Sequence, residues 1–146
     1  MQFKITTDYA IRTVLYLATK NEITTSGEIS QVMGIPQKYL IKLLGELRQH
    51  KLVRVHMGVK GGYTLNKNPQ DISLLDIVEI TESTVKINRC LEPDCYCSRE
   101  GAECCPVRKY YTVIQNHLEN SLSKITIQDL VEGKNTLPIR VIAEDG

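Results

Sequence analysis

The sequence predicts a mainly α-helical fold with one small β-hairpin, and three observations support this prediction. Apolar residues recur at helical spacing between Ile11 and Leu47. Between Val53 and Leu65, apolar and polar residues alternate around a run of glycines, which is typical of a β-hairpin. A single apolar stripe from Val107 to Ile125 predicts one long helix near the C-terminus.

Length and composition limit the class of protein. A chain of 146 residues that is 42% hydrophobic and 24% charged is long enough for one folding unit with an appended element. No apolar run reaches the roughly 18 residues of a membrane span, and no charged and apolar leader precedes the first helix. We therefore expect a cytoplasmic protein with no membrane partner.

Two helices are expected before residue 35. Thr6 or Thr7 is the predicted N-cap of the first, which is expected to end near Lys20. The second is short, with Thr25 and Glu28 at the spacing of a capping box. Its apolar face is small, so we expect it to pack against its neighbours.

A third helix is expected after a tight turn at Gly34, with Pro36 at its start. Its apolar stripe comprises Tyr39, Leu40, Leu43, Leu44 and Leu47. Two helices joined by such a turn match a helix-turn-helix, whose second helix enters the major groove of DNA. The glycine-rich hairpin that follows, with Lys60 at its tip, would make this a winged helix-turn-helix.

Charge is distributed unevenly between the two halves of the chain. Residues 1–68 contain ten Lys and Arg against four Asp and Glu, whereas residues 69–146 contain eight against thirteen. A basic half followed by an acidic one suggests that only the N-terminal part contacts a polyanion.

The long helix after Pro106 is expected to be amphipathic. Its stripe comprises Val107, Tyr110, Tyr111, Ile114, Leu118, Leu122 and Ile125, and on the opposite face are Gln115, Asn116, Glu119 and Asn120. Little chain remains to cover this stripe, so burial against a second copy in a homodimer is expected, with packing inside one chain as the alternative.

All five cysteines fall within one polar segment, at Cys90, Cys95, Cys97, Cys104 and Cys105. In a reducing compartment such a cluster more often binds metal or senses redox state than forms structural disulfides. Structural zinc favours paired C-x2-C ligands, which are lacking here, and a reversible thiol/disulfide switch is the other alternative. No nucleophile and base are recognisable together, so an enzyme is not expected.

Four sequence elements resemble those of the bacterial IscR, NsrR and CymR regulators, and the resemblance extends from about Lys4 to Gly133. They are Tyr9-Ala10-Ile11-Arg12, Ile35-Pro36 with Tyr39-Leu40, Gly61-Gly62-Tyr63-Thr64-Leu65 and Ile72-Ser73-Leu74-Leu75-Asp76-Ile77. The cysteine segment before the long helix is similar too. The resemblance implies a dimeric transcriptional regulator, a repressor, that binds a double-stranded DNA operator under the control of a 2Fe-2S or 4Fe-4S iron-sulfur cluster. An iron-sulfur carrier that does not bind DNA is the competing class.

The resemblance also implies a set of DNA-binding residues. On the recognition helix they are Gln37, Lys38, Tyr39 and Lys42, with Thr25 and Ser26 at the preceding helix and Lys60 on the wing. Tyr39 also fits the apolar stripe, so a place in the core is the alternative. Many relatives have an arginine before the wing glycines, where this chain has Met57.

Three cluster ligands follow from the same resemblance, namely Cys90, Cys97 and Cys105. Either extra cysteine, Cys95 or Cys104, is an alternate for its neighbour. Asp8 is a possible fourth ligand, supplied by the partner subunit, although it would also stabilise the start of its own helix. These assignments divide the chain into a winged helix-turn-helix at 1–80, a cysteine-rich sensor loop at 81–106, and a dimerisation helix with its C-terminal tail at 107–146.

Overall fold

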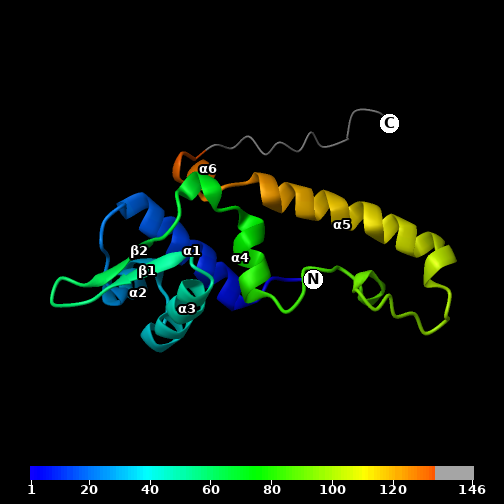
Figure 1. Cartoon of the computed structure of the whole chain (residues 1–146), viewed down its shortest axis with the longest axis horizontal. Coiled ribbons are helices and arrows are strands. Elements are labelled where there is room, and N and C mark those ends of the chain that lie inside the picture. The colour runs from blue at the N-terminus through cyan, green and yellow to red at the C-terminus, as the bar shows by residue number, and fades with distance from the viewer. Residues whose placement is uncertain (134–146) are drawn as a thin grey trace.

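The computed structural model describes residues 1–133, and the polar tail expected at the end of the chain lies outside them (Figure 1). The helices are α1 (Ile5–Lys20), α2 (Ser26–Met33), α3 (Gln37–Gln49), α4 (Leu74–Thr81), α5 (Pro106–Lys124) and α6 (Ile127–Val131). The strands are β1 (Val53–His56) and β2 (Gly62–Leu65), and three short 3-10 helices are Pro69–Asp71, Arg89–Leu91 and Ala102–Cys104. Over residues 1–133, every helix is too short or too polar to cross a membrane.

Helix α1 lies at the centre of the body and packs against α2, α3, α4, α6 and β2. The core comprises side chains from all these elements, including Ala10, Val14, Leu17, Ile29, Leu40, Leu43, Leu44, Leu47 and Ile77. Fully burying each large apolar side chain contributes about 1.5–3 kcal/mol. The leucine stripe predicted for the third helix is therefore confirmed as core.

The start of α1 differs from the prediction. The helix begins at Ile5 with Lys4 as N-cap, and no side chain from this end caps it. Instead, the Lys4 backbone N–H and the Thr7 hydroxyl both donate to Oε1 of Glu82, at 2.7 and 2.5 Å. Glu82 follows α4, so its negative charge at the helix N-terminus comes from a residue 78 positions away.

Residues near each end of α2 set the bounds of this helix, the first of the helix-turn-helix, and both ends were expected from the sequence. The Thr25 hydroxyl accepts a hydrogen bond from the Glu28 backbone N–H at 3.2 Å. The Glu28 carboxylate turns away from the cap and accepts from the Tyr16 hydroxyl at 2.7 Å, which, with Lys20, lowers the pKa of Glu28. Gly34 ends α2 in the left-handed region at φ 66°, as its predicted C-terminal position requires.

The hairpin is the predicted wing. Strands β1 and β2 pair antiparallel, with Val53 opposite Leu65 and His56 opposite Gly62. Thr24, between α1 and α2, forms an isolated antiparallel bridge with β2 by exchanging two backbone hydrogen bonds with Tyr63, at 3.0 and 2.8 Å. This close approach excludes a side chain at Gly62, where a Cβ would lie 2.6 Å from the Thr24 carbonyl oxygen.

The C-terminal elements return to the start of α4. Ser73 and Asp76 form a capping box at the start of this helix. A backbone bridge between Ser73 and Thr126 then ties the end of α5 to this point. In Figure 1, α5 extends away from the body, and the chain between α4 and α5 runs out toward its far end before turning into it.

Candidate DNA-binding surface and cysteine cavity

The starts of α2 and α3 lie together and carry most of the predicted DNA-binding residues. The Gln37 side-chain amide donates to the Ser26 hydroxyl at 3.0 Å, which joins the first turns of the two helices. Thr25 precedes α2, Lys38 follows Gln37, Lys42 lies further along α3, and all three are exposed. Helix N-termini carry partial positive charge and free N–H groups, so this surface suits phosphate as well as base edges.

Tyr39 lies at the edge of this surface and is not in the core. Its side chain is 47% exposed, and its ring packs edge-on against Tyr9 with 5.9 Å between centroids. The Arg12 guanidinium lies 5.8 Å from the Tyr9 ring centroid and pairs with Asp8 at 2.5 Å. Tyr9 and Arg12, which belong to the first motif of the resemblance, thus lie next to a predicted DNA-binding residue although no role was predicted for them from the sequence. Asp8, the predicted fourth ligand, is paired with Arg12 in this chain.

The wing presents Lys60 on a well-braced hairpin. The Arg54 guanidinium donates twice to the Asn66 side-chain oxygen, at 3.2 and 3.0 Å, and His56 bonds the Thr64 hydroxyl at 2.8 Å. At the tip, Lys60 is exposed to solvent. The structure therefore places Lys60 on a different element from the α2 and α3 residues, as predicted.

The cysteines divide into two groups. Cys90, Cys97 and Cys105 line one cavity of about 260 Å³, together with Arg108 and Tyr111 of α5; we call this the cysteine cavity. The two alternates, Cys95 and Cys104, are exposed and line a neighbouring hollow, with Cys97 on the wall between the two spaces. The three predicted ligands thus share a cavity that the two alternates do not line.

Each thiol of the cysteine cavity is held differently. Cys105 is the N-cap residue of α5, and Cys90 lies in the 3-10 helix Arg89–Leu91. The thiol of Cys97 accepts hydrogen bonds from the backbone N–H groups of Gly101 and Arg99, which lower its pKa below the ordinary value. A lowered pKa favours the thiolate, which is both the metal ligand and the nucleophile.

The side chains that line the cysteine cavity have the donor chemistry that an iron-sulfur cluster needs. Three thiolates in one cavity match the soft ligands that such clusters use. The Arg108 Nε donates to the Cys90 carbonyl at 3.1 Å, and its Nη2 lies 3.5 Å from the Cys95 sulfur, so a cation lines the cavity and contacts one of the alternate cysteines. Within residues 1–133, no three His, Cys, Asp or Glu side chains converge closely enough to hold a single metal ion. The fit therefore rests on donor chemistry and a shared cavity.

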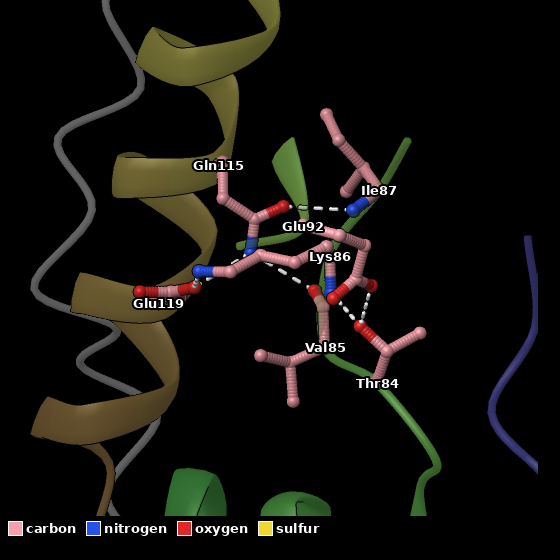
Figure 2. Close-up of polar contacts among 7 residues, drawn as sticks. All are labelled: Thr84, Val85, Lys86, Ile87, Glu92, Gln115 and Glu119. Atoms are coloured by element: carbon pink, nitrogen blue, oxygen red, sulfur yellow. Dashed lines mark hydrogen bonds and ion pairs between the residues drawn. The ribbon is translucent and has the colours of Figure 1, made fainter. Parts of the chain in front are cut away.

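One face of helix α5 contacts the chain that precedes it, and another face is exposed to solvent. Gln115 and Leu122 are its buried residues, and Gln115 bonds the backbone on either side of Lys86 (Figure 2). The prediction that Gln115 and Glu119 lie opposite the buried face was wrong, because the chain after α4 covers them. The exposed apolar side chains of α5 are Val107, Tyr110, Val113 and Ile114.

Known proteins share both the sequence and the fold. A family model described as "Rrf2: Iron-dependent Transcriptional regulator" matches residues 3–133. A candidate HTH-type transcriptional regulator of Aquifex aeolicus (strain VF5) is 30% identical over 142 residues, which cover 95% of this chain and 99% of that protein. Protein aau3 of Rhizobium meliloti (strain 1021) is 29% identical over 136 residues, covering 88% and 83%.

Solved structures agree with this relationship. CymR, the global cysteine regulator of B. subtilis, has a TM-score of 0.76 at 25% identity and covers 92% of this chain and 99% of its own. IscR of T. potens has the same fold, with a TM-score of 0.71 at 21% identity over 91% and 88% of the chains. The chain therefore belongs to the Rrf2 family of winged-helix transcription regulators, which bind DNA and are not enzymes.

Proposed function

We propose that this protein is a homodimeric repressor that binds a double-stranded operator through α3 and the wing. Thr25, Ser26, Gln37, Lys38, Tyr39, Lys42 and Lys60 would form the DNA-binding surface. We further propose that the thiolates of Cys90, Cys97 and Cys105 hold an iron-sulfur cluster that controls DNA affinity. The observation that carries the second proposal is the single cavity lined by these three residues. The units would be 1–80 for DNA, 81–106 for sensing and 107–146 for dimerisation, in a cytoplasmic protein.

The chain's own residues supply a route from the cysteine cavity to the DNA. Cys105 and the carbonyl of Cys90 are both tied to α5, whereas Cys97 lies on the connecting loop. Gathering the three thiolates on one centre would therefore fix that loop against α5. A bound cluster would supply redox and ligand-exchange chemistry at its open coordination position.

Helix α5 passes this constraint to the body. Its C-terminal end is bonded to the start of α4, where the Leu74 N–H donates to the Ile125 carbonyl at 2.9 Å. Helix α4 packs on α1, which packs on α3. In a dimer, a small rotation of α5 changes the spacing of the two recognition helices, and half-site recognition depends on that spacing. A coupling of about 1–3 kcal/mol changes affinity roughly 5- to 150-fold.

Anaerobic purification tests the cluster directly. Wild-type protein should be coloured and contain iron and sulfide, Cys97→Ala should lose both, and Cys95→Ala should retain them. An operator selected from random duplexes should show an iron-dependent affinity for wild type and for Cys95→Ala but an iron-independent one for Cys97→Ala. Colourless wild-type protein without iron would contradict the cluster, and zinc in its place would assign a structural metal.

A cluster-free thiol switch is the second candidate, because one observation favours it. The Cys97 thiol has a lowered pKa, and the Cys95 and Cys104 thiols are exposed nearby. In that case iron-free protein should form a disulfide involving Cys97 under mild oxidation, and reduction should restore its DNA affinity. An iron-sulfur carrier would instead bind iron and show no salt-dependent DNA binding.

A further inference from the structure

Gln115 is a buried polar side chain in the middle of α5, and its whole amide group is used. It is 3% exposed. Its oxygen accepts from the Ile87 backbone N–H at 2.8 Å, and its nitrogen donates to the Val85 carbonyl at 2.9 Å. Figure 2 shows the amide reaching from α5 to the backbone on both sides of Lys86.

This pair of bonds needs a side chain that donates and accepts at once. An amide does so in the way that a neighbouring β-strand would, because it presents one N–H and one C=O to an extended backbone. A glutamate at this position accepts from Ile87 but has no proton for the Val85 carbonyl. A leucine provides neither group and leaves both backbone partners without a bond.

Two further contacts from α5 hold the same stretch of chain. The Lys86 ammonium pairs with Glu119 at 2.6 Å, and the same carboxylate oxygen accepts from the Gln115 amide at 2.8 Å. Toward the start of α5, Arg108 donates to the Cys90 carbonyl at 3.1 Å. Arg108, Gln115 and Glu119 are spaced by seven and four residues, which places them on one face of the helix.

Helix α5 therefore sets the positions of both Cys90 and Cys105. Cys105 is the N-cap of α5, so its position is set by the helix itself. Cys90 follows Ile87 by three residues, and the contacts above hold both of these residues to α5. The separation of Cys90 and Cys105 across the cysteine cavity therefore depends on where the chain before Cys90 lies along α5.

We propose that Gln115 is a positioning residue for the cysteine cavity, which sets the register of Cys90 against Cys105 by bonding the backbone at Val85 and Ile87. A role of Gln115 in holding a metal rests on the function proposed above. Its role in positioning Cys90 against Cys105 does not depend on that function. Gln115 contacts no thiol, so it acts only through the segment that it holds.

An iron-free measurement tests the register. In a background of Cys95→Ser, Cys97→Ser and Cys104→Ser, only Cys90 and Cys105 remain, and dibromobimane can join them within one chain. Gln115→Glu should slow this intramolecular cross-link about tenfold, the factor that corresponds to the loss of one net hydrogen bond of about 1.4 kcal/mol. Asn116→Asp makes the same amide-to-carboxylate change at the next, exposed position and should leave the rate unchanged. Equal rates for Gln115→Glu and its parent would overturn the proposal.

The unaltered protein provides a second measurement in case Gln115→Glu does not fold. The Ile87 amide hydrogen should exchange with solvent much more slowly than in a free peptide, and more slowly than the exposed backbone around Cys95. Exchange of Ile87 at the free-peptide rate would show that the Gln115 bond does not form, and would overturn the proposal independently of any variant.

Iron retention separates this inference from the proposed function. In anaerobically loaded protein, Gln115→Glu should lose iron to a chelator about tenfold faster than wild type or Asn116→Asp, by the same hydrogen-bond factor. If Gln115→Glu slowed the cross-link but lost iron at the wild-type rate, Gln115 would position Cys90 without helping to hold the metal. Wild-type protein that takes up no iron would contradict the proposed cluster, and the cross-link would still decide the register.

Discussion

At the scale of single residues, the wing depends on two glycines at which no side chain fits. A Cβ on Gly61 would lie 2.2 Å from the His56 carbonyl oxygen, and one on Gly62 would meet the Thr24 backbone. Both contacts are with backbone, which cannot move aside as a flexible side chain can. The tight turn of the hairpin therefore selects glycine at residue 61, and its pairing with Thr24 selects glycine at residue 62.

Gly61→Ala should lower the free energy of unfolding by about 1–3 kcal/mol, the usual cost of overpacking. Gly45 provides the matched control, since it lies within α3 with nothing within 4 Å of an added Cβ. Gly45→Ala should raise stability by about 0.5–1 kcal/mol, because alanine favours the helix. Urea unfolding of both variants measures the difference, and equal stability for Gly61→Ala and wild type would contradict the tight turn.

Lys38 should contribute to DNA binding as a phosphate-directed charge. Lys38→Ala is expected to weaken binding to all duplexes alike and to reduce the slope of log K against log salt by about 0.9. Lys109→Ala, an equal change of charge at an exposed position on α5, should leave the slope unchanged. Titrations at several salt concentrations measure both slopes, and an unchanged slope for Lys38→Ala would remove Lys38 from the interface.

At the scale of elements, α5 divides into three faces with separate roles. One face, with Gln115, Leu118 and Leu122, packs against its own chain. A second exposes apolar side chains, and a third is polar at Thr112 and Asn116. The predicted single stripe is thus divided between side chains that pack within the chain and an exposed apolar surface.

The attachment of the cysteine segment to α5 should weaken in acid. The hydrogen bond from Lys86, and then that from Gln115, lower the pKa of Glu119 below its ordinary value of 4.5. A carboxylate with a depressed pKa stabilises the fold above its unfolded-state pKa, and this contribution disappears as the pH falls through the folded-state pKa. Wild type should therefore have a higher Tm than Glu119→Gln at pH 7, and the difference should shrink steadily as the pH falls below the ordinary carboxyl value of 4.5. A Tm difference that does not change as the pH is lowered would contradict this origin.

At the scale of the whole molecule, the exposed face of α5 is the surface on which a dimer would form. Tyr110 is 74% exposed, and Val107, Val113 and Ile114 are each more than half exposed. These residues lie on the helix that extends from the body, so two copies could join while both recognition helices remain free (Figure 1). A two-fold pair is also the form that a palindromic operator requires.

Ile114→Glu should convert the proposed dimer into a monomer, because a charge buried at the centre of an apolar interface is left unpaired. Asn116→Glu adds the same side chain on the polar face of α5 and should leave the dimer intact. Sedimentation velocity measures the mass of each variant, and the monomer should bind the selected operator more weakly. A monomeric wild-type protein, or a dimeric Ile114→Glu, would contradict this interface.

Much of the fold could be predicted from the sequence because its signals are local. The capping box at Ser73 and Asp76, the glycine at the end of α2 and the glycines of the wing each act within a few residues of themselves. The leucine stripe of α3 identified its buried face by period alone. The cysteine positions and the family motifs indicated the three candidate ligands before any fold was known.

The sequence by itself thus determined which segments become helix or hairpin and where the candidate thiols and cations lie along the chain. Only the tertiary structure decided that Glu82 supports the start of α1, that Gln115 is buried, and that three of the five cysteines share a cavity. Gln115 and Ile87 are 28 positions apart, and Lys4 and Glu82 are 78 apart. Periodicity shows which side chains share a face, but the partner that covers the face is chosen by packing between distant segments.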